Sequence, residues 1–168
     1  MSHSINFKNT FAKELSEICE KFIPSGFSKS EMLIKNYKLA NELGLSEEFV
    51  DSKECLHIFS GVSVPKSSIP IAQAYSGHQF GHFNPRLGDG RAMLIGELNE
   101  KDIQLKGIGI TPFSRGGDGK SSLGTVLREY VISEFMHSIN IPTTRSLFAL
   151  KTNAVSYTHL RAHETRHY

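Results

Sequence analysis

Gly88-Asp-Gly-Arg-Ala-Met-Leu-Ile-Gly-Glu-Leu98 is the stretch that decides the fold, together with Asp102-Ile-Gln-Leu-Lys106 a few residues later. Residues 91–98 are mostly apolar, and residues 102–106 alternate between polar and apolar side chains, so both stretches predict β-strands. Only a short turn separates them, which favours an antiparallel hairpin. The two glycines before the first strand suit a tight turn or a close approach of the backbone to a ligand, because glycine has no side chain.

A long helix is predicted after the hairpin, over residues 121–139, because apolar residues recur there at helical spacing. The residues expected on its apolar face are Leu123, Val126, Leu127, Tyr130, Val131, Phe135 and Ile139. Pro142 ends this helix, and residues 143–150 favour a further strand. Strands and a helix in this order predict an α+β fold with an antiparallel sheet.

The residues before the hairpin predict helices. Apolar residues at helical spacing indicate one helix over residues 6–22 and a second over Ser30–Leu43, which Gly44 would end. Ser46 has the residue type of an N-cap and would open a short third helix. The rest of this part predicts loop and short helix, so we expect residues 1–74 to form a helical N-terminal extension.

The composition is that of an ordinary globular protein. Of the 168 residues, 39% are hydrophobic and 21% are charged, and the formal net charge is only +2, so we expect neither nucleic acid nor a membrane as a partner. No apolar run reaches the length of about 18 residues that a membrane span needs. The N-terminus lacks the pattern of a secretory signal. Cys19 and Cys55 form no Cys-x-x-Cys motif, so we expect reduced thiols and a cytoplasmic protein.

Three features point to phosphate chemistry: a glycine turn at Gly88 and Gly90, a strand that ends in Lys106, and a helix that carries Glu129 and Glu134. Their order resembles the small lobe of a protein kinase, in which a glycine loop approaches the nucleotide phosphates and a strand lysine pairs with a helix glutamate. Taken alone, the same features also fit a glycine-rich hairpin with a solvated lysine.

A second glycine cluster begins at Lys106. It runs Lys106-Gly-Ile-Gly-Ile-Thr-Pro-Phe-Ser-Arg-Gly-Gly-Asp-Gly-Lys120 and combines cations, glycines and one carboxylate. Such a segment can form a nest of backbone amides that binds an anion. The alternative is a flexible surface loop, although Thr111 and Pro112 argue against full flexibility.

A resemblance to a known family rests on three ordered motifs. The first is Tyr75-Ser-Gly-His-Gln-Phe-Gly-His-Phe-Asn-Pro-Arg-Leu-Gly-Asp-Gly-Arg-Ala92, and the second is Leu105-Lys-Gly-Ile-Gly-Ile-Thr-Pro-Phe-Ser-Arg-Gly-Gly-Asp-Gly119. The third combines Leu127-Arg-Glu-Tyr130, Ser133-Glu-Phe-Met-His137 and Ile141-Pro-Thr-Thr-Arg-Ser-Leu147. From about residue 30 to about residue 150, the sequence resembles the selenoprotein O family of protein adenylyltransferases.

The resemblance implies a function and a set of site residues. Members of this family have a kinase-like fold and bind ATP in an orientation flipped relative to ordinary kinases. They transfer AMP to Ser, Thr or Tyr hydroxyls of proteins, with Mg or Mn. By the same motifs, Lys106 would meet the ATP phosphates and Glu129 would be its helix partner. The other residues that would contact ATP are Gly88, Gly90, Arg91, Asp118 and Gly119.

Three positions depart from the family pattern. Arg86 stands where the family usually has Gln, Lys120 stands where it has Arg, and a further family Arg is missing near Gly124. Lys120 keeps the positive charge but loses the two-pronged hydrogen bonding of a guanidinium. The expected nucleotide contacts along that edge are therefore weaker.

The resemblance also implies that the family's catalytic base, metal ligands and large lobe lie downstream of this chain. We therefore expect a kinase-like small lobe over residues 75–154 that binds nucleotide, holds no catalytic residue and is inactive as it stands. Two alternatives remain open. One is a non-catalytic module that binds nucleotides or other anions, and the other is a phosphotransferase of the kinase type.

Residues 155–168 do not continue the family pattern, and we expect them to be a foreign tail. They contain His163-Glu-Thr-Arg-His167, formally a zinc-hydrolase motif, with His159 one turn earlier. Because no further ligand follows, we expect at most adventitious metal binding there. His78 and His82 also have metal-like spacing, but a glycine between them disfavours a helix, so we expect structural hydrogen bonding instead.

Overall fold

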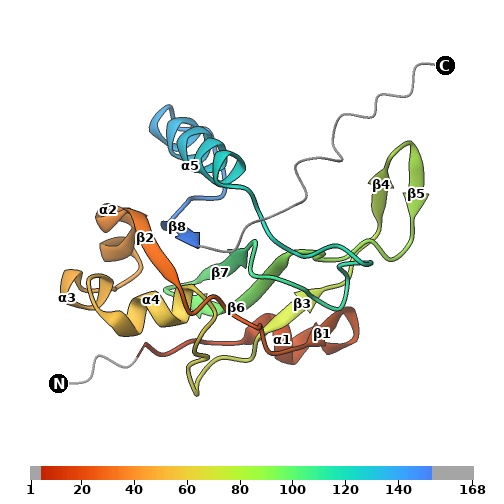
Figure 1. Ribbon diagram of the computed structural model, residues 1–168, viewed down its shortest axis with the longest axis horizontal. Coiled ribbons are helices and arrows are strands. Elements are labelled where there is room, and N and C mark those ends of the chain that lie inside the picture. The colour runs from red at the N-terminus through yellow and green to blue at the C-terminus, as the bar shows by residue number, and fades with distance from the viewer. Residues whose placement is uncertain (1–4, 153–168) are drawn as a thin grey trace.

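The computed structural model describes residues 5–152 as a mixed α+β fold (Figure 1). Its main sheet is antiparallel, with the strand order β1-β3-β6-β7. These strands are Cys19–Lys21, Ile71–Gln73, Ala92–Leu98 and Lys101–Lys106. Two smaller antiparallel sheets pair β2 with β8 and β4 with β5.

The remaining elements lie around the main sheet. The smaller sheets are built from β2 (Ser30–Lys35), β8 (Phe148–Thr152), β4 (Gly77–Gln79) and β5 (His82–Asn84). The helices are α1 (Thr10–Glu14), the single 3₁₀ turn η1 (Ser16–Ile18), α2 (Tyr37–Glu42), α3 (Glu47–Val50), α4 (Lys53–Phe59) and α5 (Leu123–Ser138). In Figure 1, α2, α3 and α4 gather at one end of the molecule and hairpin β4–β5 projects at the other. Within the described part, no helix is both long and apolar enough to cross a membrane.

The predicted hairpin is confirmed as β6–β7. Its register pairs Ala92 with Lys106. Asn99 and Glu100 form the tight turn between the strands, with φ angles of 46° and 62°. Two successive residues with positive φ give a turn whose twist matches that of the flanking strands, which explains how so short a connection closes the hairpin.

Both faces of β6 are covered, and this places the core. Met93 and Ile95 belong to the larger apolar cluster, which also contains the buried side chains of α2, α3 and α4. Leu94 lies on the opposite face and packs with Ile71 and with Ala12 of α1. Because alternate residues of a strand face opposite sides of the sheet, a strand covered on both faces needs a continuous apolar run, which residues 92–95 supply.

The predicted helix over residues 6–22 is wrong over most of its length. Helix α1 and η1 occupy only its middle, and the chain then extends as β1. Cys19 pairs with Gln73, and Lys21 pairs with Ile71. Backbone pairing with β3 outweighs the local helical pattern, because helix propensity is a weak preference that tertiary contacts override.

The predicted helix Ser30–Leu43 is correct only in its second half. Its first half is β2, which pairs with β8 and alternates exposed with half-buried side chains over most of its length. Helix α2 begins after Asn36, whose side chain accepts a hydrogen bond from Leu39 N at 3.1 Å. An N-cap of this kind satisfies a free amide of the first turn, so the helix starts there. With β1, β2 and β3 present, the part before residue 75 is not the purely helical extension that we predicted.

Two shorter predictions for this part are confirmed. Gly44 lies just beyond the end of α2. Ser46 accepts a hydrogen bond from Phe49 N at 3.2 Å and opens α3. Both depend on contacts within one turn of the chain, which a sequence pattern can reveal.

The predictions after the hairpin are correct in kind. Helix α5 covers most of the predicted residues 121–139. Its predicted apolar face is not buried, however: Ser133 is its buried residue, while Val131 and Phe135 are 60% and 55% exposed. Strand β8 starts at Phe148, later than predicted, because the residues before it run as an irregular segment between α5 and the strand.

Some predictions concern residues outside the described part. The tail at residues 155–168, with its His163-Glu-Thr-Arg-His167 motif, lies there. The predicted division of the chain after residues 74 and 154 stays a prediction.

Ile71 offers a test of the core, since it is fully buried between α1 and the sheet. We expect Ile71→Ala to lower the free energy of unfolding by about 2–5 kcal/mol, because it removes buried methyl groups and leaves a cavity. Urea denaturation followed by circular dichroism measures this change. The control is Ile18→Ala, since Ile18 is 45% exposed. An equal loss of stability in the two variants would contradict this account of the core.

Candidate functional site

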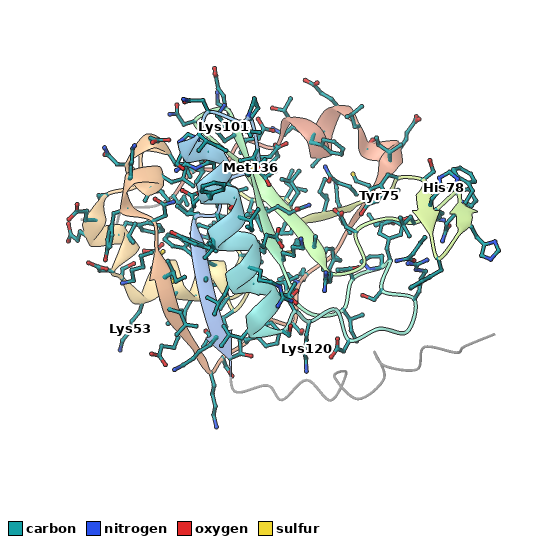
Figure 2. The ribbon with its side chains drawn as sticks, turned by 90° about the horizontal axis from the view of Figure 1, so that it is seen from above. Lys53, Tyr75, His78, Lys101, Lys120 and Met136 are labelled. Carbon is teal, nitrogen blue, oxygen red and sulfur yellow. The ribbon has the colours of Figure 1, made fainter. Side chains whose placement is uncertain are left out.

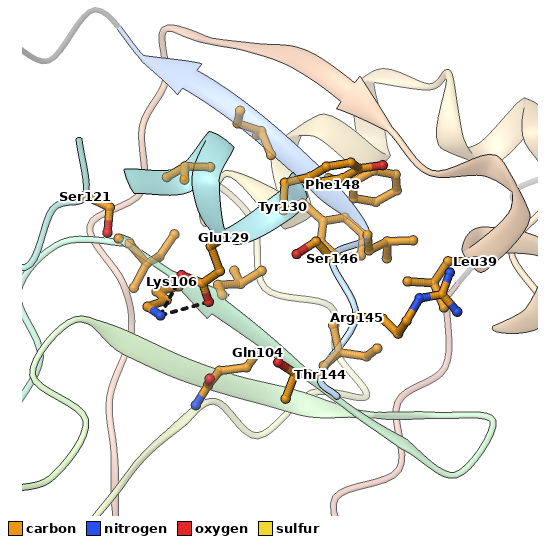
Figure 3. A pocket seen from close by; sticks show the side chains of 18 of the residues that line it. Leu39, Gln104, Lys106, Ser121, Glu129, Tyr130, Thr144, Arg145, Ser146 and Phe148 are labelled. Atoms are coloured by element: carbon orange, nitrogen blue, oxygen red, sulfur yellow. Dashed lines mark hydrogen bonds and ion pairs between the residues drawn. The ribbon is translucent and has the colours of Figure 1, made fainter. Parts of the chain in front are cut away.

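Lys106 and Glu129 form an ion pair between the end of β7 and the middle of α5. Lys106 Nζ lies 2.8 Å from Glu129 Oε1 and 2.7 Å from Oε2, so the ammonium donates to both carboxylate oxygens (Figure 3). The two side chains are 43% and 44% exposed. An ion pair this exposed adds at most about 1 kcal/mol to stability. Its main effect is therefore positional, because it holds a cation in place while leaving it accessible from solvent.

The glycine turn lies directly beside Lys106. The hairpin register pairs Ala92 with Lys106, and Gly107 N donates a hydrogen bond to Arg91 O at 2.7 Å. Because Arg91 follows the turn without a gap, these contacts bring residues 88–91 and Lys106 to the same end of the hairpin. The lysine and the turn therefore lie close enough to contact one ligand.

Asp89 anchors the glycine turn to the sheet. Its carboxylate accepts hydrogen bonds from Gln73 N at 3.0 Å and from Gln104 Nε2 at 3.5 Å. Asp89 is 5% exposed, and this burial raises the pKa of its carboxyl group, although hydrogen bonds from Gln73 and Tyr75 oppose the rise. Gln104 and Lys106 are two residues apart on one strand, so their side chains lie on the same face of the sheet. The contact with Gln104 therefore places the turn on the face that carries Lys106.

Hydroxyl groups attach the second glycine cluster to the turn. Thr111 Oγ1 donates to Asp89 O at 2.6 Å, and Ser114 Oγ donates to Gly90 O at 2.7 Å. Thr111 N in turn donates to Ser114 Oγ at 2.8 Å. Each hydroxyl thus binds a carbonyl of the turn and an atom of its own loop, so this segment is held against the turn.

Two glycines occupy places where a side chain would not fit. A Cβ atom at Gly88 would overlap the ring of Phe113, and a Cβ atom at Gly119 would overlap the carbonyl group of Gly109. Both glycines have a φ angle of 64°, which is unfavourable for other residues. Gly109 N also donates to Gly119 O at 3.1 Å. The glycines therefore allow the two loops to pack closely, backbone against backbone.

Accessible positive charge surrounds the turn. Arg91 is exposed, and its guanidinium has no ion-pair partner within residues 5–152. Ile108 and Lys120 form a β-bridge, so Lys120 lies near the end of β7. Asp118 Oδ1 accepts a hydrogen bond from Lys120 N at 3.0 Å. With Lys106, these cations can offset the charge of a polyanion such as a polyphosphate.

A cavity of about 1050 Å³ lies between α5, β7 and the segment that leads into β8 (Figure 3). Its walls are mixed, with apolar side chains such as Phe148 and polar ones such as Gln104 and Thr144. Lys106 and Glu129 line it, and the predicted site residues that do not are Gly88, Gly90, Arg91, Asp118 and Gly119. The candidate site is therefore the cavity mouth at Lys106 together with the turn beside it.

No metal centre is found in this part of the protein: within residues 5–152, no group of three or more His, Cys, Asp or Glu side chains could hold a metal ion. The involvement of Mg or Mn stays a prediction.

His78 and His82 lie on the two strands of hairpin β4–β5 rather than on a helix. The His78 ring packs against Phe83, with 5.4 Å between the ring centroids. Figure 2 shows His78 at the outer end of the molecule, away from α5. The predicted hydrogen bonding of the two imidazoles finds no support within residues 5–152.

Sequence reasoning did not assign a site role to Asp89, Thr111 or Ser114. Each has a short polar side chain within two residues of a glycine, and such side chains commonly hydrogen-bond to nearby backbone in tight turns. That signal indicates a turn but not its partner. The carbonyl groups that accept hydrogen bonds from the Thr111 and Ser114 hydroxyls lie more than twenty residues away in the chain.

The turn, the paired lysine and the attached loop define an α+β protein with a candidate anion site. Comparison with known proteins gives the family. The sequence model of the family described as "Protein adenylyltransferase SelO" matches residues 2–164. The chain belongs to the SelO family.

Curated relatives carry the name "Protein nucleotidyltransferase YdiU". The chain is 49% identical over 157 residues to the protein of Clostridium botulinum (strain Alaska E43 / Type E3), and 48% identical over 160 residues to that of Anoxybacillus flavithermus. It is 45% identical over 159 residues to the protein of Mycolicibacterium paratuberculosis. The alignments cover 90%, 92% and 92% of this chain but 32%, 33% and 32% of the relatives. The chain thus spans about a third of the length of the curated relatives it matches.

Gly119→Ala should disrupt the second glycine cluster, whereas Gly116→Ala should not. The two φ angles are 64° and 84°, so both alanines carry a similar backbone strain of about 1–2 kcal/mol. Only at Gly119 does the new Cβ overlap a backbone group, since no heavy atom lies within 4 Å of a Cβ at Gly116. Hydrogen exchange of the Gly109 amide, which donates to Gly119 O, measures the difference. Equally fast exchange in the two variants would contradict the close packing described here.

Asp89→Ala should lower the free energy of unfolding by about 1–3 kcal/mol, because the amide of Gln73 loses its carboxylate acceptor. Asp89→Asn keeps an acceptor and should cost less. The raised pKa of Asp89 means that the folded state prefers the protonated carboxyl. The wild-type chain should therefore lose stability relative to Asp89→Asn as the pH rises from about 4 through the folded pKa, after which the difference is constant. Chemical denaturation across this pH range measures the difference, and no pH dependence would contradict it.

Proposed function

We propose that this chain forms the part of a protein adenylyltransferase that binds the phosphates of ATP. The whole protein transfers AMP to Ser, Thr or Tyr hydroxyls of other proteins. The observation that carries the proposal is the accessible Lys106 ammonium, held by Glu129 beside the glycine turn, in a chain of the SelO family. The name of the relatives, nucleotidyltransferase, agrees with this reaction.

The described residues correspond, in this proposal, to a kinase-like small lobe. A glycine turn leads into an antiparallel hairpin, the second strand ends in a lysine, and the next helix supplies its glutamate. This order and pairing are those of the small lobe of protein kinases. Charge compensation and positioning are the main contributions that a protein makes to transfer at phosphorus, and both need a fixed cation.

Each predicted site residue has a distinct part in this proposal. Lys106 and Arg91 offset the negative charge of the phosphates. Gly90 supplies a backbone donor, since its N–H makes no hydrogen bond within residues 5–152, whereas Gly88 N already donates to Tyr75 O at 3.2 Å. Gly88 instead leaves room for the ring of Phe113, which packs where a side chain at position 88 would lie. The residues that approach from the second loop are Asp118 and Gly119.

The proposed reaction balances as a transfer at the α-phosphorus. The hydroxyl oxygen of the acceptor protein forms a bond to the α-phosphorus of ATP, and the bond from that phosphorus to the oxygen bridging to the β-phosphate breaks. Pyrophosphate leaves with the electron pair, and the hydroxyl proton passes to a base. We assign no base among residues 5–152.

Lys106→Ala tests the binding half of the proposal in this chain. Isothermal titration should show ATP binding to the wild-type chain and a loss of about tenfold or more in affinity for the variant, because a hydrogen bond to a charged group is worth about 1.5–3 kcal/mol. The control is Lys53→Ala, since Lys53 lies in α4 and does not line the cavity at Lys106. Equal heats for Lys106→Ala and the wild-type chain would contradict the proposed site.

The reaction itself is tested in a full-length relative, such as the Clostridium botulinum protein that is 49% identical over the aligned region. The relative is incubated with ATP and an acceptor protein, and the intact mass of the acceptor is measured. Addition of AMP supports adenylyl transfer. Addition of phosphate would favour a kinase, and an unchanged mass in every tested acceptor would leave only the binding module.

A further inference from the structure

Helix α5 carries Glu129, yet apolar packing does little to hold it. Ser133 is its buried residue. Val131, Ile132 and Phe135 are 60%, 59% and 55% exposed, and the cavity described above lies between the helix and β7. Contacts other than a hydrophobic core must therefore set the position of the helix and of the Glu129 carboxylate.

Glu134 makes a better-shielded ion pair than Glu129 does. Arg145 Nε donates to Glu134 Oε1 and Arg145 Nη2 donates to Oε2, both at 2.8 Å, so the ion pair is bidentate. The side chains of Arg145 and Glu134 are only 14% and 22% exposed. Hydrogen bonding by Arg145 is the main reason why the pKa of the Glu134 carboxyl is lowered. A shielded bidentate pair is stronger than the exposed pair of Lys106 and Glu129.

Two further donors complete the contacts of Glu134. Asn36 Nδ2 donates to Oε2 at 2.8 Å, and Ser146 N donates to Oε1 at 3.2 Å. Asn36 is also the N-cap of α2, and its N–H donates to Leu147 O at 2.9 Å. Ser133 Oγ and Ser146 Oγ lie 2.8 Å apart. The cluster therefore fastens α5 to α2 and to the segment before β8.

We propose that Glu134, Arg145 and Asn36 are positioning residues that set α5 so that Glu129 meets Lys106. As a statement about ATP binding, this inference rests on the proposed function. Glu129 and Glu134 are five residues apart, which places them about 140° apart around the helix and about 7.5 Å apart along it. Cations on two different elements hold these two carboxylates, so together they fix the rotation of α5 and its position along its axis.

Arg145→Ala is the test variant, because it removes both arms of the bidentate pair and leaves Lys106 and Glu129 intact. ATP affinity should fall about tenfold, or about 1.4 kcal/mol. In a Glu129→Gln background the same substitution should change the affinity by less than about twofold, because its effect passes through Glu129. Arg145→Lys keeps the charge with fewer donors and should give an intermediate affinity. If Arg145→Ala does not fold, Arg145→Lys serves as the test variant.

A second measurement does not need ATP. An ammonium that donates hydrogen bonds to a carboxylate reacts more slowly with an amine-reactive reagent than one that is released, so Arg145→Ala should raise the acylation rate of Lys106. Mass spectrometry of the peptide measures this rate. The control is Glu31→Ala, which removes an exposed 2.8 Å ion pair with Lys151 between β2 and β8. This control should leave both the acylation rate and the ATP affinity unchanged.

The outcomes separate the two proposals. If the wild-type chain binds no ATP, the proposed nucleotide site fails, and the acylation rate of Lys106 still decides whether the cluster positions α5. If a folded Arg145 variant loses thermal stability but keeps the wild-type acylation rate, the cluster is merely structural and the inference is overturned. An equal loss of ATP affinity with and without Glu129 would also overturn it, because the effect would then bypass Glu129.

Discussion

The register of hairpin β6–β7 is the constraint on which the rest of the structure depends. It pairs Ala92 with Lys106, and the bond from Gly107 N to Arg91 O secures that end of the hairpin. A slip of one residue would turn Lys106 to the opposite face of the sheet, away from Glu129. The apolar side chains of β6 resist such a slip, because both faces of this strand are buried. The core therefore decides where the accessible cation lies, although it contacts no ligand.

Different forces hold the sheet and the helix beside it. Apolar burial is strong but non-directional, and it fixes the sheet against α1 on one face and α2, α3 and α4 on the other. Helix α5 lacks such burial and depends on directional polar contacts, at Glu129 near its middle and at Glu134 further along. A contribution of about 1 kcal/mol or less from the exposed pair is too small to hold a helix alone. The shielded Glu134–Arg145 pair therefore determines where Glu129 can reach.

The sequence predicts the parts of the fold that depend on local contacts and misses those that depend on distant ones. The hairpin, α5 and the Ser46 cap follow from periodicity and turn chemistry within a few residues. Strand β1 was predicted as helix because its partner β3 lies some fifty residues away, and no local pattern reveals that pairing. The order of the motifs predicts that Lys106 meets a helix with Glu129 and Glu134, and the family resemblance selects Glu129. The sequence gives Asp89 no role, since a carboxylate between two glycines does not show that it is buried.

The burial of Asp89 carries an electrostatic cost if the proposed site binds an anion, because a carboxylate beneath that site repels the ligand. Its contacts explain why it is tolerated: Asp89 accepts hydrogen bonds from Gln73 N and Gln104 Nε2. Both donors belong to strands of the main sheet, and their hydrogen bonds partly compensate the negative charge of the Asp89 carboxylate. Two accessible cations, Arg91 and Lys106, lie beside the turn, and Glu129 already pairs with Lys106. A fixed turn offsets part of this Coulombic cost, because a mobile turn would have to be ordered each time it bound an anion.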